Sequence, residues 1–183
     1  MAIHKLLSVL LLAVLTAPAA AFTPAQKASE AGALEKAEAL IQQQKYGEAE
    51  ERLNALTATQ AKNAQLWFDL GFCQSHQDKA SEAAASYRKA VELAPNWFEA
   101  NLNLGVALAK SGALSAAVPV LQHATELKPT SGGPKAVSKA WESLAQALEE
   151  SDAKASAAAY QKAAELDPEN SDLDVGAGRM LEK

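Results

Sequence analysis

Three observations predict that the chain is an all-α protein in which helix pairs stack into an α-solenoid. Alanine-rich stretches dominate the sequence and aromatic residues make up only 5%, a composition that favours helices over β-sheets. Short motifs recur 34 residues apart, and a fixed period of this size indicates stacked supersecondary units. Prolines follow apolar segments at the same spacing and prevent a helix from continuing. We expect about four helix pairs and a C-terminal capping helix.

The overall composition already excludes several classes of protein. A chain of 183 residues with 49% hydrophobic residues and a net charge of −5 is long and apolar enough to fold around a core. Acidic residues outnumber basic ones, so the sequence does not indicate the basic surface that binds nucleic acid. We therefore expect no nucleic-acid partner. The single cysteine, Cys73, excludes an intramolecular disulfide framework and any multi-cysteine metal site.

The first 21 residues have the three-part layout of a secretory signal peptide. Lys5 gives a positive start, the segment 6–15 is almost continuously apolar, and small residues lead to cleavage sites after Ala19 or Ala21. The alternative is an uncleaved anchor, but a membrane-spanning helix needs about 20 apolar residues. We therefore expect a periplasmic or secreted protein, with residues 22–183 as its folded domain and no stable membrane insertion after cleavage.

Pairs of equivalent residues define the repeat. They are Leu70 and Leu104, Gly71 and Gly105, Ala83 and Ala117, Ala90 and Ala124, and Pro95 and Pro129. Small residues at the glycine and alanine positions let two helices approach closely, while large residues fill the space beside them. We place the units at about residues 30–63, 64–97, 98–131 and 138–170, followed by a capping helix over 171–183. Ser81 and Ser115 are expected to be the N-caps of second helices.

This pattern resembles the tetratricopeptide repeat (TPR) family. Residues 64–97 carry its motif most fully, with Trp67, Leu70, Gly71, Ala83, Tyr87, Ala90 and Pro95 at the positions that the family expects. The unit at 138–170 also fits, through Trp141, Tyr160 and Pro168, whereas the unit at 30–63 lacks a closing proline. The resemblance implies a curved array of helix pairs whose concave face, lined by the first helices, binds another protein or a peptide segment.

Carried over position by position, the resemblance predicts a partner-binding groove. The residues are Gln65, Phe68, Phe72, Ser75, His76, Leu102, Asn103, Val106, Lys110 and Gln146. Some family members hold a C-terminal carboxylate in a clamp of polar and basic side chains. Here Phe68, Phe72, Leu102 and Val106 occupy clamp positions and only Asn103 fits, so we do not expect that binding mode.

Catalytic and metal-binding patterns are missing from the sequence. His76 and His123 have no second ligand three or four residues away, and Cys73 has no accompanying motif and should be a buried, inert thiol. Neither a phosphate-binding glycine loop nor a nucleophile motif occurs. We therefore expect a protein that is not an enzyme and has no cofactor and no metal.

Two functional hypotheses remain. In the first, the chain is a scaffold or assembly factor of the cell envelope, and Phe68 and Phe72, side by side at i and i+4, anchor an apolar or amphipathic segment of a partner. These two aromatic residues could instead pack within the fold, because helically spaced aromatics are usually core. In the second hypothesis, the chain is a structural module that forms a homo-oligomer by stacking through its end repeats.

Overall fold

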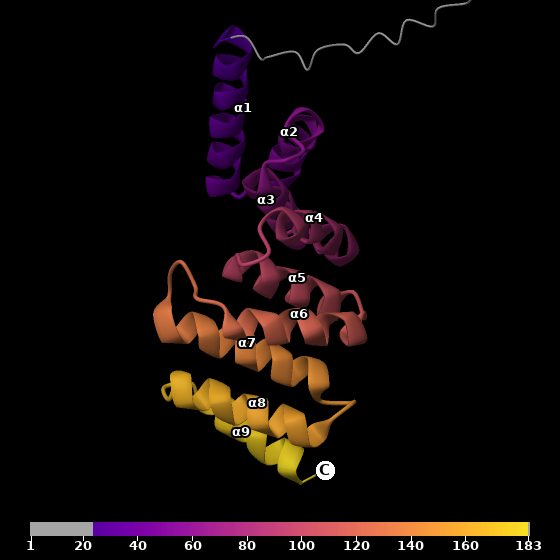
Figure 1. Cartoon of the computed structure of the whole chain (residues 1–183), viewed down its shortest axis with the longest axis vertical. Coiled ribbons are helices and arrows are strands. Elements are labelled where there is room, and N and C mark those ends of the chain that lie inside the picture. The colour runs from indigo at the N-terminus through magenta and orange to yellow at the C-terminus, as the bar shows by residue number, and fades with distance from the viewer. Residues whose placement is uncertain (1–23, 183) are drawn as a thin grey trace, which may run out of the picture.

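The structure is a computed structural model that describes residues 24–182, and these residues form nine α-helices and no strand (Figure 1). The helices are α1 (Pro24–Gln42), α2 (Tyr46–Thr59), α3 (Ala64–Ser75), α4 (Ala80–Leu93), α5 (Phe98–Lys110), α6 (Leu114–Glu126), α7 (Gly133–Leu148), α8 (Ala153–Leu166) and α9 (Ser171–Leu181). The predicted all-α solenoid is thereby confirmed. The predicted signal peptide, residues 1–21, lies outside the described residues.

The helices pack mainly on their neighbours along the chain. Every pair of helices in substantial contact is consecutive, except that α5 also touches α7. Figure 1 shows α5 to α9 stacked one above the other, with α1 steeply inclined to them at the other end. This arrangement is the quasi-one-dimensional architecture of a repeat protein.

The repeat period is visible in the turns inside the helix pairs. Gln44, Asp78 and Gly112 are 34 residues apart, and each adopts a left-handed backbone conformation, with φ of 60°, 59° and 82°. This conformation ends the first helix and reverses the chain. The second helices α4, α6 and α8 end shortly before Pro95, Pro129 and Pro168, as the prolines predict.

The expectation that Ser81 and Ser115 cap second helices is wrong. Helices α4 and α6 begin one residue earlier than those serines, so both serines are the second residue of their helix. The N-cap positions are Lys79 and Ala113, and neither makes a side-chain cap hydrogen bond. A serine inside the first turn cannot serve as the N-cap, because that role needs a residue with non-helical backbone before the helix.

Glycines mark the closest helix crossings. A Cβ atom added to Gly71 would lie 2.8 Å from Cδ1 of Tyr87, and one added to Gly105 would lie 2.5 Å from Cδ2 of Leu121. In each unit, the first helix therefore meets a large side chain of its own second helix at the glycine. This is the close approach that the repeat motif predicts.

The buried residues form a long core with a separate N-terminal part. Ala37, Leu53, Leu66 and Cys73 belong to a group made by α1 to α3, whereas the larger group extends from α4 to α9. A third, small group joins Phe98, Ala124 and Ala140. Of the helices in the described residues, none is both long and apolar enough to cross a membrane.

The segment between α6 and α7 departs from the regular period. Helix α7 begins at Gly133, with Pro134 in its first turn and the left-handed Gly132 (φ 80°) immediately before it. The backbone N–H of Thr130 donates to Oε1 of Glu99 over 2.9 Å, and the Thr130 hydroxyl donates to the same oxygen. These hydrogen bonds fix the inserted loop against the start of α5.

Candidate binding site

A hollow of about 440 Å³ lies between the first helices α5 and α7. Three of the predicted groove residues, Val106, Lys110 and Gln146, line it together. The remaining lining residues are Ala109, Leu114, Lys139, Ser143 and Ala147. The surface therefore combines an apolar floor with lysines and two side chains that form hydrogen bonds.

A second hollow, of about 350 Å³, continues toward the C-terminal end between α7 and α9. Gln146 lines both hollows, so the two adjoin, and we call their combined surface the first-helix groove. From α9, its residues include Asp172, Val175 and Arg179. These three were not predicted from the sequence, because α9 was expected only to cap the fold. They lie one, four and eight residues after Ser171, the same offsets at which Gln65, Phe68 and Phe72 follow Ala64. Repeat position therefore indicates that they belong to the groove.

The charges change sign along the first-helix groove. The α5–α7 hollow has two lysines: Nζ of Lys139 lies 2.9 Å from Oε2 of Glu142, whereas Lys110 has no ion pair within residues 24–182. The α7–α9 hollow contains Glu142 and Asp172 together with Arg179. A segment bound along the groove would contact a cationic surface at α5 and α7 and a mixed, more acidic surface at α7 and α9.

A hydrogen-bonded group fixes α9 against the fourth unit. The hydroxyl of Tyr160 donates to Oε1 of Glu149 over 2.5 Å, and Nη2 of Arg179 lies 2.7 Å from the same oxygen. Burial and the adjacent Glu149 carboxylate raise the pKa of Tyr160 far above its usual value, so the hydroxyl keeps its proton. Because Tyr160 and Arg179 line the α7–α9 hollow, this group also shapes the groove.

Phe68 and Phe72, which were predicted to anchor a partner segment, pack in two different aromatic groups. Phe68 is half-buried against the rings of Tyr87 and Trp97, with ring centroids 5.5 and 4.6 Å apart. It packs against the α4–α9 core. Much of its surface is therefore already used by the fold, which answers the question that the sequence left open for this residue.

Phe72 belongs to a different aromatic group. Its ring lies 6.1 Å from that of Tyr46 and 4.4 Å from that of His76. The imidazole of His76 is stacked on Tyr46, with ring centroids 4.5 Å apart and an angle of 13° between the planes. This group connects α3 to α2, with His76 on its exposed side.

The other predicted residues lie along α3 and α5. Gln65 is exposed and donates from Nε2 to Oδ1 of Asp69 over 2.8 Å. Asn103 is half-buried and donates from Nδ2 to the carbonyl of Glu99 over 2.8 Å. Ser75 is half-buried at the end of α3, and Leu102 is half-buried against two of the core groups. The structure thus brings Val106, Lys110 and Gln146 to one hollow and distributes the rest.

Two ionisable side chains inside the fold have pKa values raised by burial. Cys73 is fully buried, and burial, followed by the charges of Asp69 and Glu50, raises the pKa of its thiol to about 12. Burial likewise raises the pKa of Asp69 to about 6. Among the residues that the structure describes, no group of three or more histidine, cysteine or acidic side chains is arranged to hold a metal ion.

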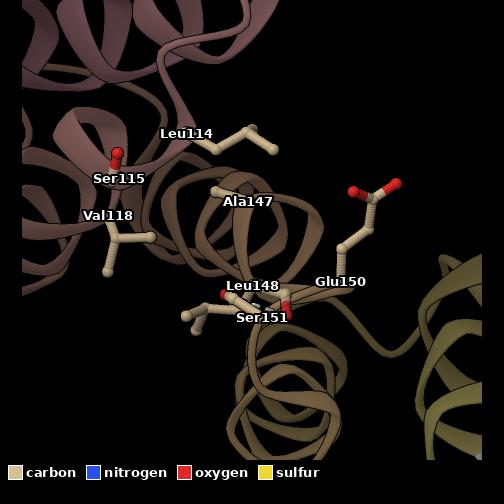
Figure 2. Close-up of a pocket in the computed structure, with 7 residues that line it drawn as sticks. All are labelled: Leu114, Ser115, Val118, Ala147, Leu148, Glu150 and Ser151. Atoms are coloured by element: carbon tan, nitrogen blue, oxygen red, sulfur yellow. Dashed lines mark hydrogen bonds between the residues drawn. The ribbon is translucent and has the colours of Figure 1, made fainter.

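A further hollow of about 490 Å³ lies at the edge where α6 begins and α7 ends (Figure 2). Leu114 and Ala147 line both this hollow and the first-helix groove, so the apolar surface continues around the end of α7. Figure 2 shows that Leu114, Val118 and Leu148 surround the hollow while the carboxylate of Glu150 extends away from it. The edge is therefore mainly apolar.

The fold and the first-helix groove define a repeat protein of the α-solenoid class. The chain matches the tetratricopeptide repeat family over residues 34–96 and 77–132, which together span more than half of it. The chain belongs to this family. A comparison with curated proteins finds no match.

Solved structures with the same fold include several forms of MamA. The structure of MamA residues 41–end from Desulfovibrio magneticus RS-1 is 21% identical in sequence, with 82% of each chain covered and a TM-score of 0.72. Another MamA crystal structure is 18% identical, with 85% of this chain and 82% of that chain covered and a TM-score of 0.78. YrrB, described as a TPR protein with an unusual peptide-binding site, is 19% identical, with 81% and 74% covered and a TM-score of 0.70. These similarities concern the fold.

Proposed function

We propose that this protein is a non-catalytic scaffold or assembly factor of the cell envelope that binds an apolar or amphipathic segment of a partner protein in the first-helix groove. The observation that most strongly supports this function is the α5–α7 hollow. There, Val106, Ala109 and Leu114 form an apolar surface beside Lys110 and Gln146. Ligand sites combine a largely apolar surface with a few polar groups that orient the ligand. Placement in the envelope rests on the predicted signal peptide.

Two further observations support a peptide ligand. Solenoid proteins use the extended surface of their stacked units for binding, and the two adjoining hollows extend over three first helices. The YrrB structure is described by its peptide-binding site, so the same fold accommodates a peptide in at least one other protein. Among the described residues, the groove offers charges of both signs for fixing the direction of a bound segment.

Site-specific photo-crosslinking in the native cell tests this function. A photoreactive amino acid replaces the exposed Gln146, which lies where the two hollows adjoin, and in a control replaces the exposed Arg88 on α4. We expect an adduct of defined mass from position 146 only. Val106→Glu should reduce it by roughly tenfold or more, because a charge then replaces apolar floor. Equal adducts at both positions, or no effect of Val106→Glu in a folded variant, would contradict the proposal.

Self-association through the end repeats is the second candidate. It is supported by the two most exposed large hydrophobic side chains of the described residues, Val175 (69% exposed) and Leu181 (66% exposed), which both lie on α9. If copies stack there, sedimentation velocity should show a concentration-dependent dimer that Leu181→Glu converts to monomer. A monomer at all concentrations would eliminate this candidate and leave the scaffold proposal unaffected.

A further inference from the structure

A hollow larger than either part of the first-helix groove lies outside that groove. It has a volume of about 690 Å³ and lies between the second helices α6 and α8, with residues of α7 as its floor. Trp141, Leu144 and Leu148 of α7 supply large apolar side chains, and α8 supplies small ones, including Ala158. We call it the second-helix groove. It shares no lining residue with the first-helix groove.

Trp141 in this groove differs from its equivalent in the second unit. The indole N–H of Trp67 donates to the carbonyl of Ala61 over 2.8 Å, and that carbonyl lies in the loop before α3. The residue six positions before Trp141 is Lys135, which is already inside α7 because the inserted loop makes α7 start at Gly133. Carbonyls inside a helix bond to the N–H groups of the next turn.

The indole of Trp141 is therefore available to a ligand. Within residues 24–182 its N–H has no hydrogen-bond acceptor, and the side chain is only half-buried. A tryptophan with an unused N–H donor and an accessible ring offers both apolar contact and a polar handle. Such residues are enriched among the side chains that dominate protein interfaces.

The charges around Trp141 indicate the chemistry of the ligand. Glu126 lines the groove on α6 and Glu165 lines it on α8, and both carboxylates are largely exposed. Lys162 is the groove's one basic residue, and its Nζ lies 2.7 Å from Oε2 of Glu165. The residues that line the groove therefore carry one more carboxylate than basic groups, and Oε2 of Glu126 lies 3.9 Å from Nδ1 of His123, which is not part of the lining. A lysine or arginine side chain over an indole ring gains cation–π attraction, which nearby carboxylates reinforce.

We propose that the second-helix groove is a separate docking site for an amphipathic helix of a partner protein, with a basic side chain of that helix seated against Trp141 between Glu126 and Glu165. The apolar face of the helix lies on Leu144, Leu148 and the alanines of α8. A groove formed by two helices over a third accepts a helix in this way. With one site on each face, the protein holds two partner segments at once.

Fluorine NMR of the full chain labelled with 5-fluorotryptophan tests the site directly. The chain has three tryptophans, so Trp67, Trp97 and Trp141 each give one assignable signal. The probes are two amidated, acetylated amphipathic helical peptides with a leucine and alanine face. They differ only in a central arginine or glutamate. We expect the arginine peptide to shift the Trp141 signal in a saturable way, while the signal of Trp97, whose ring packs on Phe68 and does not line this groove, stays unchanged.

Matched variants identify the contact. Ala158→Lys places a bulky positive charge in the groove and should weaken binding of the arginine peptide at least tenfold. Ala85→Lys, at the equivalent exposed position of α4 two residues before Tyr87, should leave it unchanged. Glu126→Lys should weaken the arginine peptide and strengthen the glutamate peptide. Circular dichroism checks that each variant is folded.

Four results would overturn the proposal. They are an unmoved Trp141 signal, equal binding of both peptides, binding that survives Ala158→Lys, and a Trp141 shift that depends on protein concentration without peptide. The last result would assign the groove to a second copy of the chain. A shift of Trp97 alone would place the peptide outside the second-helix groove and reject this site. The first-helix groove is tested separately by crosslinking at position 146, so the two proposals fail independently.

Discussion

Replacing Gly105 with alanine tests whether the close helix crossings organise the fold. A new Cβ atom would lie 2.5 Å from Cδ2 of Leu121, whereas ordinary contacts are 3.4–4 Å, so one side must move by about 1 Å. Leu121 is fully buried within the α4–α9 core, so its movement would displace other core side chains. Overpacking of this kind costs about 1–3 kcal/mol, against a gain of about 1 kcal/mol in helix propensity. The difference is a net destabilisation of roughly 0–2 kcal/mol, and we expect a value of about 1 kcal/mol.

Gly178 provides the matched control. It lies in α9 ten residues after Pro168, as Gly105 lies ten residues after Pro95, so the two glycines share a repeat position. A Cβ atom added to Gly178 meets nothing within 4 Å. Gly178→Ala should therefore stabilise the protein by about 0.5–1 kcal/mol, because alanine loses less backbone entropy on folding.

Urea unfolding followed by circular dichroism at 222 nm measures both changes. The two substitutions should have opposite signs and differ by about 2 kcal/mol in the free energy of unfolding. In the double variant with Leu121→Val, the loss should be smaller than the sum of the two single losses, because the shortened side chain relieves the contact. The reasoning fails if Gly105→Ala is as stabilising as Gly178→Ala.

Three further predictions follow from the buried polar groups. Asp69→Asn should stabilise the protein at pH 7.5, because burial raises the pKa of Asp69 to about 6, above its unfolded value, and this penalises the charged form. The gain should decline in thermal unfolding as the pH falls from 6 to 4 and disappear below about pH 3, where the carboxyl is protonated in both states. Tyr160→Phe removes the hydrogen bond to Glu149 and should cost about 1–2 kcal/mol, with faster hydrogen exchange of α9. The buried Cys73 thiol should react with Ellman's reagent no faster than the protein unfolds, and an immediate reaction in native buffer would refute its burial.

Much of the fold could be predicted because each repeat position has one dominant physical requirement. Gly71 and Gly105 must be small to admit Tyr87 and Leu121, and a proline such as Pro95 must follow a helix end. Such requirements can be recognised in a sequence from the 34-residue period and from the size of the residue at each repeat position. The helix starts were less predictable because the left-handed turn residues, which are not all glycine, set the start of the second helix without help from a serine cap.

The candidate site was less predictable than the fold because position in a helix does not specify what the neighbouring helices contribute. Phe68 occupies a groove position, yet Trp97 and Tyr87 cover part of it from α4 and the loop before α5. The availability of Trp141 depends on the loop insertion that starts α7 early. Equivalent residues such as Trp67 and Trp141 therefore have different surroundings despite the same motif.

Packing between consecutive helices also determines how the molecule responds to force. Because α5 and α7 form the only substantial contact between helices of the described part that are not consecutive, tension applied at the two ends acts on a series of similar boundaries. Each interface between consecutive helices can open slightly without disrupting the next one. The stack of helices is therefore expected to extend elastically under a small force. A ligand bound across α5, α7 and α9 would connect these three helices and make the C-terminal half of the molecule resist extension more strongly.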